Sequence, residues 1–93
     1  NLDKAEFTRQ QLEKIPQIKV FRDRPIFNEF PVILPERADV VVNKMIAKGF
    51  AAGFPLGRYY KGMEHNLLIA VTEQRTKEEI VKFAESMEAV LCS

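Results

Sequence analysis

A chain of 93 residues is long enough for one domain with a modest core and too short for a large active-site cleft between two lobes. Charged residues form 29% of the chain and leave a formal net charge of +1, which excludes a broad electrostatic surface for nucleic acid or an anionic membrane. A single cysteine, Cys92, and a single histidine exclude an internal disulfide and a Cys/His zinc site, and they favour a cytoplasmic location.

The first part of the chain predicts a helix followed by a short strand. Asp3 and Glu6 form the Asp-x-x-Glu pattern of a capping box, which starts a helix predicted over residues 3–15. Pro16 lacks an amide hydrogen and disfavours helix in the residue before it, so the helix is expected to end there. Alternation of apolar and polar residues then predicts an edge strand over residues 18–21.

A second strand and a second helix are predicted next. Aromatic and β-branched residues favour a strand over residues 27–34, in which Pro31 requires an edge position, a bulge or an amide that faces away from the neighbouring strand. Residues 36–48 predict a helix that ends before Gly49, because a left-handed helix cap favours glycine. The expected buried face of this helix consists of Ala38, Val41, Val42, Met45 and Ile46.

Residues 50–56 predict a short and irregular strand. Strand propensity is interrupted here, because Gly53, Pro55 and Gly57 lie within an otherwise apolar and aromatic segment. A polar turn over residues 61–66 then returns the chain to the strand that we expect at the centre of the fold.

The central strand is predicted over residues 67–72, which are apolar up to the final threonine and are therefore expected to be covered on at least one face. Thr76 and Glu79 form a Thr-x-x-Glu capping box for a helix predicted over residues 76–91. Apolar residues recur along this helix at three- and four-residue spacing, so one face is expected to be buried. That face consists of Ile80, Phe83, Ala84, Met87 and Leu91.

These elements, in the order α, β, β, α, β, β, α, predict an α+β fold with a small antiparallel or mixed sheet and helices mainly on one face. No repeat or linker interrupts the chain, so residues 1–93 are expected to form a single domain. Because the chain begins with Asn1 and not with methionine, we expect it to be cut from a longer chain.

Motifs that carry chemistry are absent from the sequence. It contains no nucleotide-binding glycine loop, nucleophile elbow, Cys/His pair or cluster of three metal ligands, so the chain by itself is predicted not to be a catalyst. Arg58 and Arg75 are the candidate functional residues, because a loop arginine can bind a carboxylate or phosphate through two hydrogen bonds. Solvated surface charge is the alternative interpretation of both.

Three blocks of the chain resemble one known family. They are residues 27–35, which begin Phe-Asn-Glu-Phe and end Leu-Pro, residues 53–60, which include Gly-Phe-Pro-Leu-Gly-Arg, and residues 67–80, which read Leu-Leu-Ile-Ala-Val-Thr-Glu-Gln-Arg-Thr-Lys-Glu-Glu-Ile. They resemble the C-terminal end of glycine dehydrogenase (decarboxylating), and more closely the α subunit, or subunit 1, of the two-subunit bacterial P-protein of the glycine cleavage system. The resemblance spans residues 27–90.

The resemblance implies the small C-terminal domain of an aminotransferase-like, fold type I enzyme that uses pyridoxal phosphate (PLP). In that family the enzyme decarboxylates glycine and passes the aminomethyl group to the lipoyl arm of the H-protein. The lysine that binds PLP is implied to belong to the partner β subunit, so no cofactor is expected in this chain. Arg58 and Arg75 are then expected to lie together at an interface with the rest of the P-protein, with Glu73 as the nearest carboxylate.

A different class of protein is the alternative hypothesis. The order of elements is also typical of a free-standing, ferredoxin-like α+β module that binds a metabolite or regulates a partner, because many unrelated functions share that alternation. The missing initiator methionine and the specificity of residues 72–80 argue against it.

Overall fold

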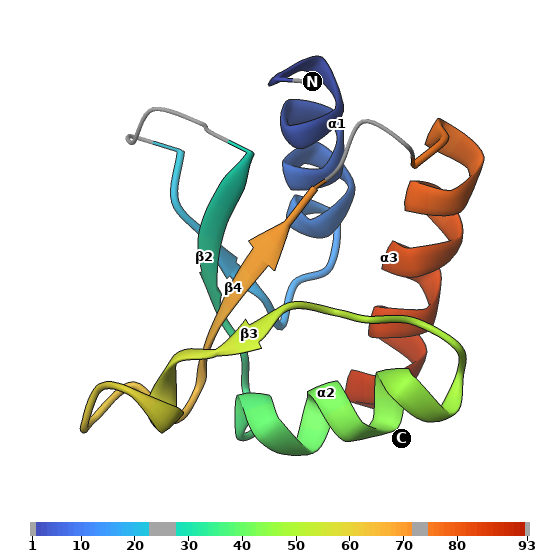
Figure 1. The fold of residues 1–93 in the computed structure, drawn as a ribbon. Coiled ribbons are helices and arrows are strands. Elements are labelled where there is room, and N and C mark those ends of the chain that lie inside the picture. Colours follow the sequence, from blue (N-terminus) through green and yellow to red (C-terminus); the bar gives the residue numbers. More distant parts are fainter. Residues whose placement is uncertain (1, 23–27, 72–74, 93) are drawn as a thin grey trace.

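The computed structural model describes residues 2–22, 28–71 and 75–92 of the chain. Helices and short strands alternate along these ranges (Figure 1). Their bounds, in chain order, are α1 Leu2–Glu13, β1 Lys19–Val20, β2 Glu29–Ile33, α2 Ala38–Ala47, β3 Phe54–Pro55, the 3-10 turn η1 Leu56–Arg58, β4 Asn66–Ala70 and α3 Lys77–Cys92.

The four strands form one sheet in the order β1-β2-β4-β3, and each neighbouring pair is antiparallel. The predicted α+β fold class is therefore confirmed, with antiparallel pairing throughout the described sheet. The last predicted strand, β4, does lie in the interior of the sheet, because it pairs with β2 on one side and with β3 on the other.

Pro31 lies in β2, an interior strand, without breaking the ladder to β4. The Val71 N–H donates to the Asn28 carbonyl, and the Leu34 N–H donates to the His65 carbonyl. Hydrogen-bonded and non-hydrogen-bonded positions alternate along an antiparallel ladder. Asn28 and Leu34 are hydrogen-bonded positions, so Pro31, three residues from each, is a non-hydrogen-bonded position whose amide nitrogen faces away from β4. On that other side β1 pairs only with Val32 and Ile33, so the missing N–H of Pro31 removes no bond of the ladder.

All three helices cover the same face of the sheet (Figure 1). One cluster of buried apolar side chains joins the two layers, and within it β2 and β4 contribute alternate residues, as the two-residue period of a strand requires. None of the described helices combines the length and apolar content needed to cross a membrane. The sheet residues of the cluster are Phe30, Val32, Leu34, Leu67, Ile69 and Val71.

The capping box at the start of α3 forms as its sequence indicates. The Glu79 backbone N–H donates to Thr76 Oγ1 over 3.1 Å, and the Thr76 backbone N–H donates to Glu79 Oε1 over 2.8 Å. Both bonds satisfy amides that the first helical turn leaves without an intrahelical partner.

The buried face of α3 differs from the predicted one at its border. Ile80, Ala84 and Met87 are buried, whereas Phe83 and Leu91 are only partly buried and Val90, which was not predicted, is fully buried. The apolar stripe is thus rotated toward Val90. Phe83 instead meets the ring of Phe50 edge-on, with centroids 5.9 Å apart.

The predicted face of α2 is wrong at one residue. Ala38, Val41, Val42 and Met45 are buried, but Ile46 is 59% exposed. Ile46 lies at the border of the stripe in the last turn of the helix, where Met45 takes the position toward the core. The glycine cap is present, because Gly49 has a φ of 90° and donates its N–H to the Ile46 carbonyl.

The least regular predicted segment is also the one where the observed bounds differ most. Of residues 50–56, only Phe54 and Pro55 form a strand, and η1 begins immediately after them. Gly53 adopts a φ of 146°, a conformation that interrupts a regular strand and that non-glycine residues rarely adopt. Parts of two other predicted strands, residue 27 and residue 72, lie outside the described residues.

Gly53 provides a test of how closely the β3 segment approaches β4. A Cβ atom built on Gly53 would lie 2.2 Å from the Leu68 carbonyl oxygen, whereas one on Gly62, whose φ is also positive, would meet nothing within 4 Å. Gly53→Ala should therefore lower the free energy of unfolding by about 2 kcal/mol or more, and Gly62→Ala by only about 1 kcal/mol. Urea unfolding of both variants measures the difference, and equal losses would contradict the close approach.

Candidate functional site

Arg58 lies at the end of η1, exposed, on the rim of a hollow of about 210 Å³. This hollow is formed where the start of α2, the β3 segment and the residues before β4 come together. We name it the polar hollow, and it is lined by Arg37, Asp39, Pro55, Gly57, Arg58 and Glu64.

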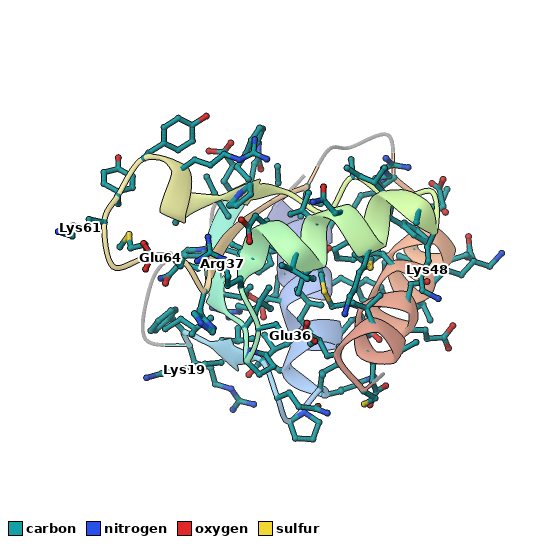
Figure 2. The ribbon with its side chains drawn as sticks, turned by 90° about the horizontal axis from the view of Figure 1, so that it is seen from below. Lys19, Glu36, Arg37, Lys48, Lys61 and Glu64 are labelled. Carbon is teal, nitrogen blue, oxygen red and sulfur yellow. The ribbon has the colours of Figure 1, made fainter. Side chains whose placement is uncertain are left out.

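Charged side chains of both signs lie around the polar hollow. Arg37 donates from Nε to Asp39 Oδ1 and from Nη2 to Asp39 Oδ2, each over 3.2 Å, in a two-bond pair. That hydrogen bonding lowers the pKa of the Asp39 carboxyl and raises the pKa of the Arg37 guanidinium. The nearby Glu64 carboxylate also raises the Arg37 pKa, by a smaller amount. Figure 2 shows Arg37 and Glu64 side by side at this corner of the molecule.

Backbone contacts hold the walls of the polar hollow together. The Ala38 N–H donates to the Glu64 carbonyl over 2.8 Å, which ties the first residue of α2 to the segment before β4. A Cβ atom on Gly57 would lie 2.8 Å from Glu64 Cα, so η1 also packs tightly on that segment. The hollow is therefore a feature of the packed fold and not of one loop.

Arg75 occupies a different place. It lies between β4 and α3 with a largely exposed side chain, 3.7 Å from the Glu79 carboxylate. It borders a shallow hollow of about 50 Å³ whose other lining residues are mostly apolar, among them Phe50, Ile69 and Phe83.

The predicted pairing of Arg58 with Arg75 does not occur. Because β3 and β4 are antiparallel, the residues that follow them leave the sheet at opposite ends. Arg58 lies by Glu64, before β4 begins, and Arg75 follows the end of β4, so the five residues of that strand, about 17 Å, separate the two positions. Glu73, the carboxylate predicted beside them, lies outside the described residues.

Arg37, Asp39 and Glu64 were not singled out from the sequence. The first two lie 25 or more residues before Glu64, and each occurs in an ordinary polar context. What brings them together is the contact of the α2 start with the segment before β4. Neither helix periodicity nor a local motif reports such a contact.

The lysines of the chain all lie within the described residues. A Schiff-base lysine needs a site shielded from water, and every lysine that the structure describes is at least partly exposed. The polar hollow carries two carboxylates, Asp39 and Glu64, beside two guanidinium groups, Arg37 and Arg58. Within the described residues, no group of three or more His, Cys, Asp or Glu side chains could hold a metal ion.

Comparison with solved structures defines the class of protein. No family model matches the chain. Its fold is similar to part of a glycine decarboxylase (P-protein) of the glycine cleavage system, solved in inhibitor-bound form, with a TM-score of 0.86 and 29% identity over 97% of this chain and 20% of that one. The chain thus has the fold of part of a P-protein.

Sequence relatives narrow this similarity to one subunit. The chain is 44% identical over 98% of its length to the probable glycine dehydrogenase (decarboxylating) subunit 1 of Geotalea uraniireducens, and 43% identical over its whole length to that of Citrifermentans bemidjiense. It spans about a fifth of the length of these curated relatives, 21% in each. The chain is therefore a homologue of a segment of glycine dehydrogenase (decarboxylating) subunit 1, and the resemblance found in the sequence is confirmed.

The capping box beside Arg75 gives this end of the domain a pH dependence. Hydrogen bonds from Thr76, first from its backbone N–H, lower the pKa of the Glu79 carboxyl below its ordinary value of 4.5, and Arg75 contributes less. A carboxyl with a lowered folded-state pKa stabilises the fold above pH 4.5, and this stabilisation is lost as the pH falls through the folded-state value.

Glu79→Gln should therefore be less stable than the natural chain at neutral pH, and the difference should shrink as the pH falls below 4.5. Urea midpoints measured at a series of pH values give that difference directly. Glu85→Gln, which removes an exposed carboxylate from the middle of the same helix, is the matched control. A difference between Glu79→Gln and the natural chain that stays constant with pH would contradict the assignment.

Proposed function

We propose that this chain is the C-terminal small domain of the α subunit, or subunit 1, of a two-subunit P-protein, and that it serves the enzyme as a structural and interface domain. The observation that carries the proposal is the similarity to subunit 1, which extends over 98–100% of this chain at 43–44% identity. The exposed lysines and the mixed charge of the polar hollow support a role without catalysis.

In this proposal the complete enzyme is cytoplasmic, decarboxylates glycine with PLP and passes the aminomethyl group to the lipoyl arm of the H-protein. PLP, when bound, supplies the electron sink for the loss of carboxylate, and the partner β subunit holds it. The contribution of this chain is to pack its helices and sheet in a fixed arrangement, so that Arg58 and Arg75 are presented at two separate points of the subunit surface. Each arginine is then an independent candidate for an interface contact.

Activity should require the complete subunits. Full-length subunit 1 combined with the β subunit is expected to exchange the glycine carboxyl with labelled bicarbonate, whereas the 93-residue chain alone should neither exchange it nor retain PLP through dialysis. Bound PLP is measured by its absorbance before and after borohydride reduction. PLP fixed by borohydride to a lysine of the 93-residue chain would contradict the proposal, as would the absence of exchange in the complete assembly.

The two arginines are tested one at a time in full-length subunit 1. An arginine that binds a partner carboxylate through two hydrogen bonds loses that geometry on replacement by lysine, even though the charge is kept. Arg58→Lys and Arg75→Lys should therefore weaken association with the β subunit almost as much as the alanine variants do. Lys61→Ala, which removes an exposed cation of the turn close to η1, is the control. If all four arginine variants associate and exchange like the natural subunit, both residues are ordinary surface charges.

A further inference from the structure

One pair of charged residues at the polar hollow is already satisfied within the structure. Both carboxylate oxygens of Asp39 accept hydrogen bonds from Arg37, and Oδ1 accepts a further one from the Val40 N–H. Arg37 and Asp39 therefore neutralise each other at the start of α2. A molecule in the hollow would meet them as a paired group and not as two free charges.

The other two charged residues of the hollow remain open. The Arg58 guanidinium takes part in none of the ion pairs among the described residues. Glu64 accepts the Gly62 N–H at Oε2 over 3.1 Å, and within the same part of the chain its Oε1 accepts no hydrogen bond. One free guanidinium and one free carboxylate oxygen thus border the same hollow.

The backbone beneath these two open groups is fixed. Tyr59 and Tyr60 both donate their N–H groups to the Leu56 carbonyl, which closes the turn that carries Arg58. Gly57 packs so tightly on the Glu64 backbone that a Cβ atom would lie 2.8 Å from Glu64 Cα. The two groups are therefore held at one place in the fold, yet their side chains do not pair with each other.

The charges of the hollow select the class of ligand. A simple anion would reach Arg58 but would also face the carboxylates of Glu64 and Asp39, and a simple cation would face two guanidinium groups. A molecule with a carboxylate and an ammonium group avoids both repulsions. Its carboxylate can accept two hydrogen bonds from Arg58, while its ammonium group donates to Glu64. Free α-amino acids carry these two charges at neutral pH.

The size of the hollow limits the ligand further. Its volume is about 210 Å³, whereas pockets for drug-sized ligands begin at about 300 Å³. Gly57 adds no side chain to the wall, and the buried ring of Pro55 supplies an apolar surface. An amino acid with a small side chain is the kind of molecule that fits.

We propose that the polar hollow binds a free α-amino acid with a small side chain, with Arg58 at its carboxylate and Glu64 at its ammonium group. The inference goes beyond the proposed interface role, because the residues that form the site all belong to this chain. Water screens ion pairs at an exposed site, so the expected dissociation constant is on the order of millimolar.

Saturation-transfer NMR on full-length subunit 1, without the β subunit, tests the site with glycine as the probe. Acetate, which has only the carboxylate, and methylammonium, which has only the ammonium group, are the matched ligands. Glycine should bind in the millimolar range, and each matched ligand should bind roughly tenfold more weakly, because it forms only one of the two ion pairs. This comparison uses the natural subunit, so it does not depend on a variant that could fail to fold.

Two variants locate the bound glycine. Arg58→Gln and Glu64→Gln should each weaken glycine binding roughly tenfold. Glutamine at position 64 can still accept the Gly62 N–H, so the substitution removes the charge and keeps the hydrogen bond of the turn. Lys48→Gln and Glu85→Gln, which remove exposed charges away from the hollow, are the controls and should bind glycine like the natural subunit.

Three results would overturn the inference. Failure of glycine to bind at about 100 mM means that the hollow holds only water and counterions. Acetate that binds as well as glycine means that Arg58 is a simple anion site. Glycine binding that either variant leaves unchanged means that the amino acid binds elsewhere in the subunit. None of these measurements involves PLP, the β subunit or glycine exchange, so a failure of the proposed function is recognised separately.

Discussion

The antiparallel pairing of β4 with both β2 and β3 is the constraint on which the rest of this structure depends. It sets the alternation that sends Leu67 and Ile69 into the helix layer and Leu68 to the opposite face of the sheet. A shift of one residue in this register would exchange the two sets and expose the core. The same pairing draws Gly53 against the Leu68 carbonyl, where no other residue has space, and it places the segment before β4 where Ala38 can bind it.

Local signals in the sequence predicted the elements well, because their causes lie within a few residues. The capping box of Thr76 and Glu79 and the glycine cap at Gly49 depend only on the chain on either side of them. The central position of β4 was also indicated, since its residues are apolar up to the end. What periodicity could not give was the border of each buried face. Ile46 and Val90 are border residues, and the packing of neighbouring elements decides on which side of the border they lie.

The candidate site could be predicted far less completely, because it depends on which ends of the strands meet. Arg58 and Arg75 each lie on a turn as expected, yet only the strand direction determines whether two turns share an end of the sheet. The observed antiparallel order separates them. It brings Arg58 instead to Arg37 and Glu64, whose association arises from a tertiary contact over more than 25 residues of chain. No short motif carries information over that distance.

Apolar groups are distributed differently on the two sides of the sheet. On one side, the three helices bury alternate apolar residues of β2 and β4 in a single cluster. On the other side, Phe54 is 53% exposed, whereas Leu68, its neighbour in the ladder, is half-buried. Arg58 and Arg75 lie at opposite ends of β4 and are held differently. The close packing of Gly57 on Glu64 fixes the backbone beside Arg58, whereas the side chain of Arg75 lies 3.7 Å from the Glu79 carboxylate on the surface.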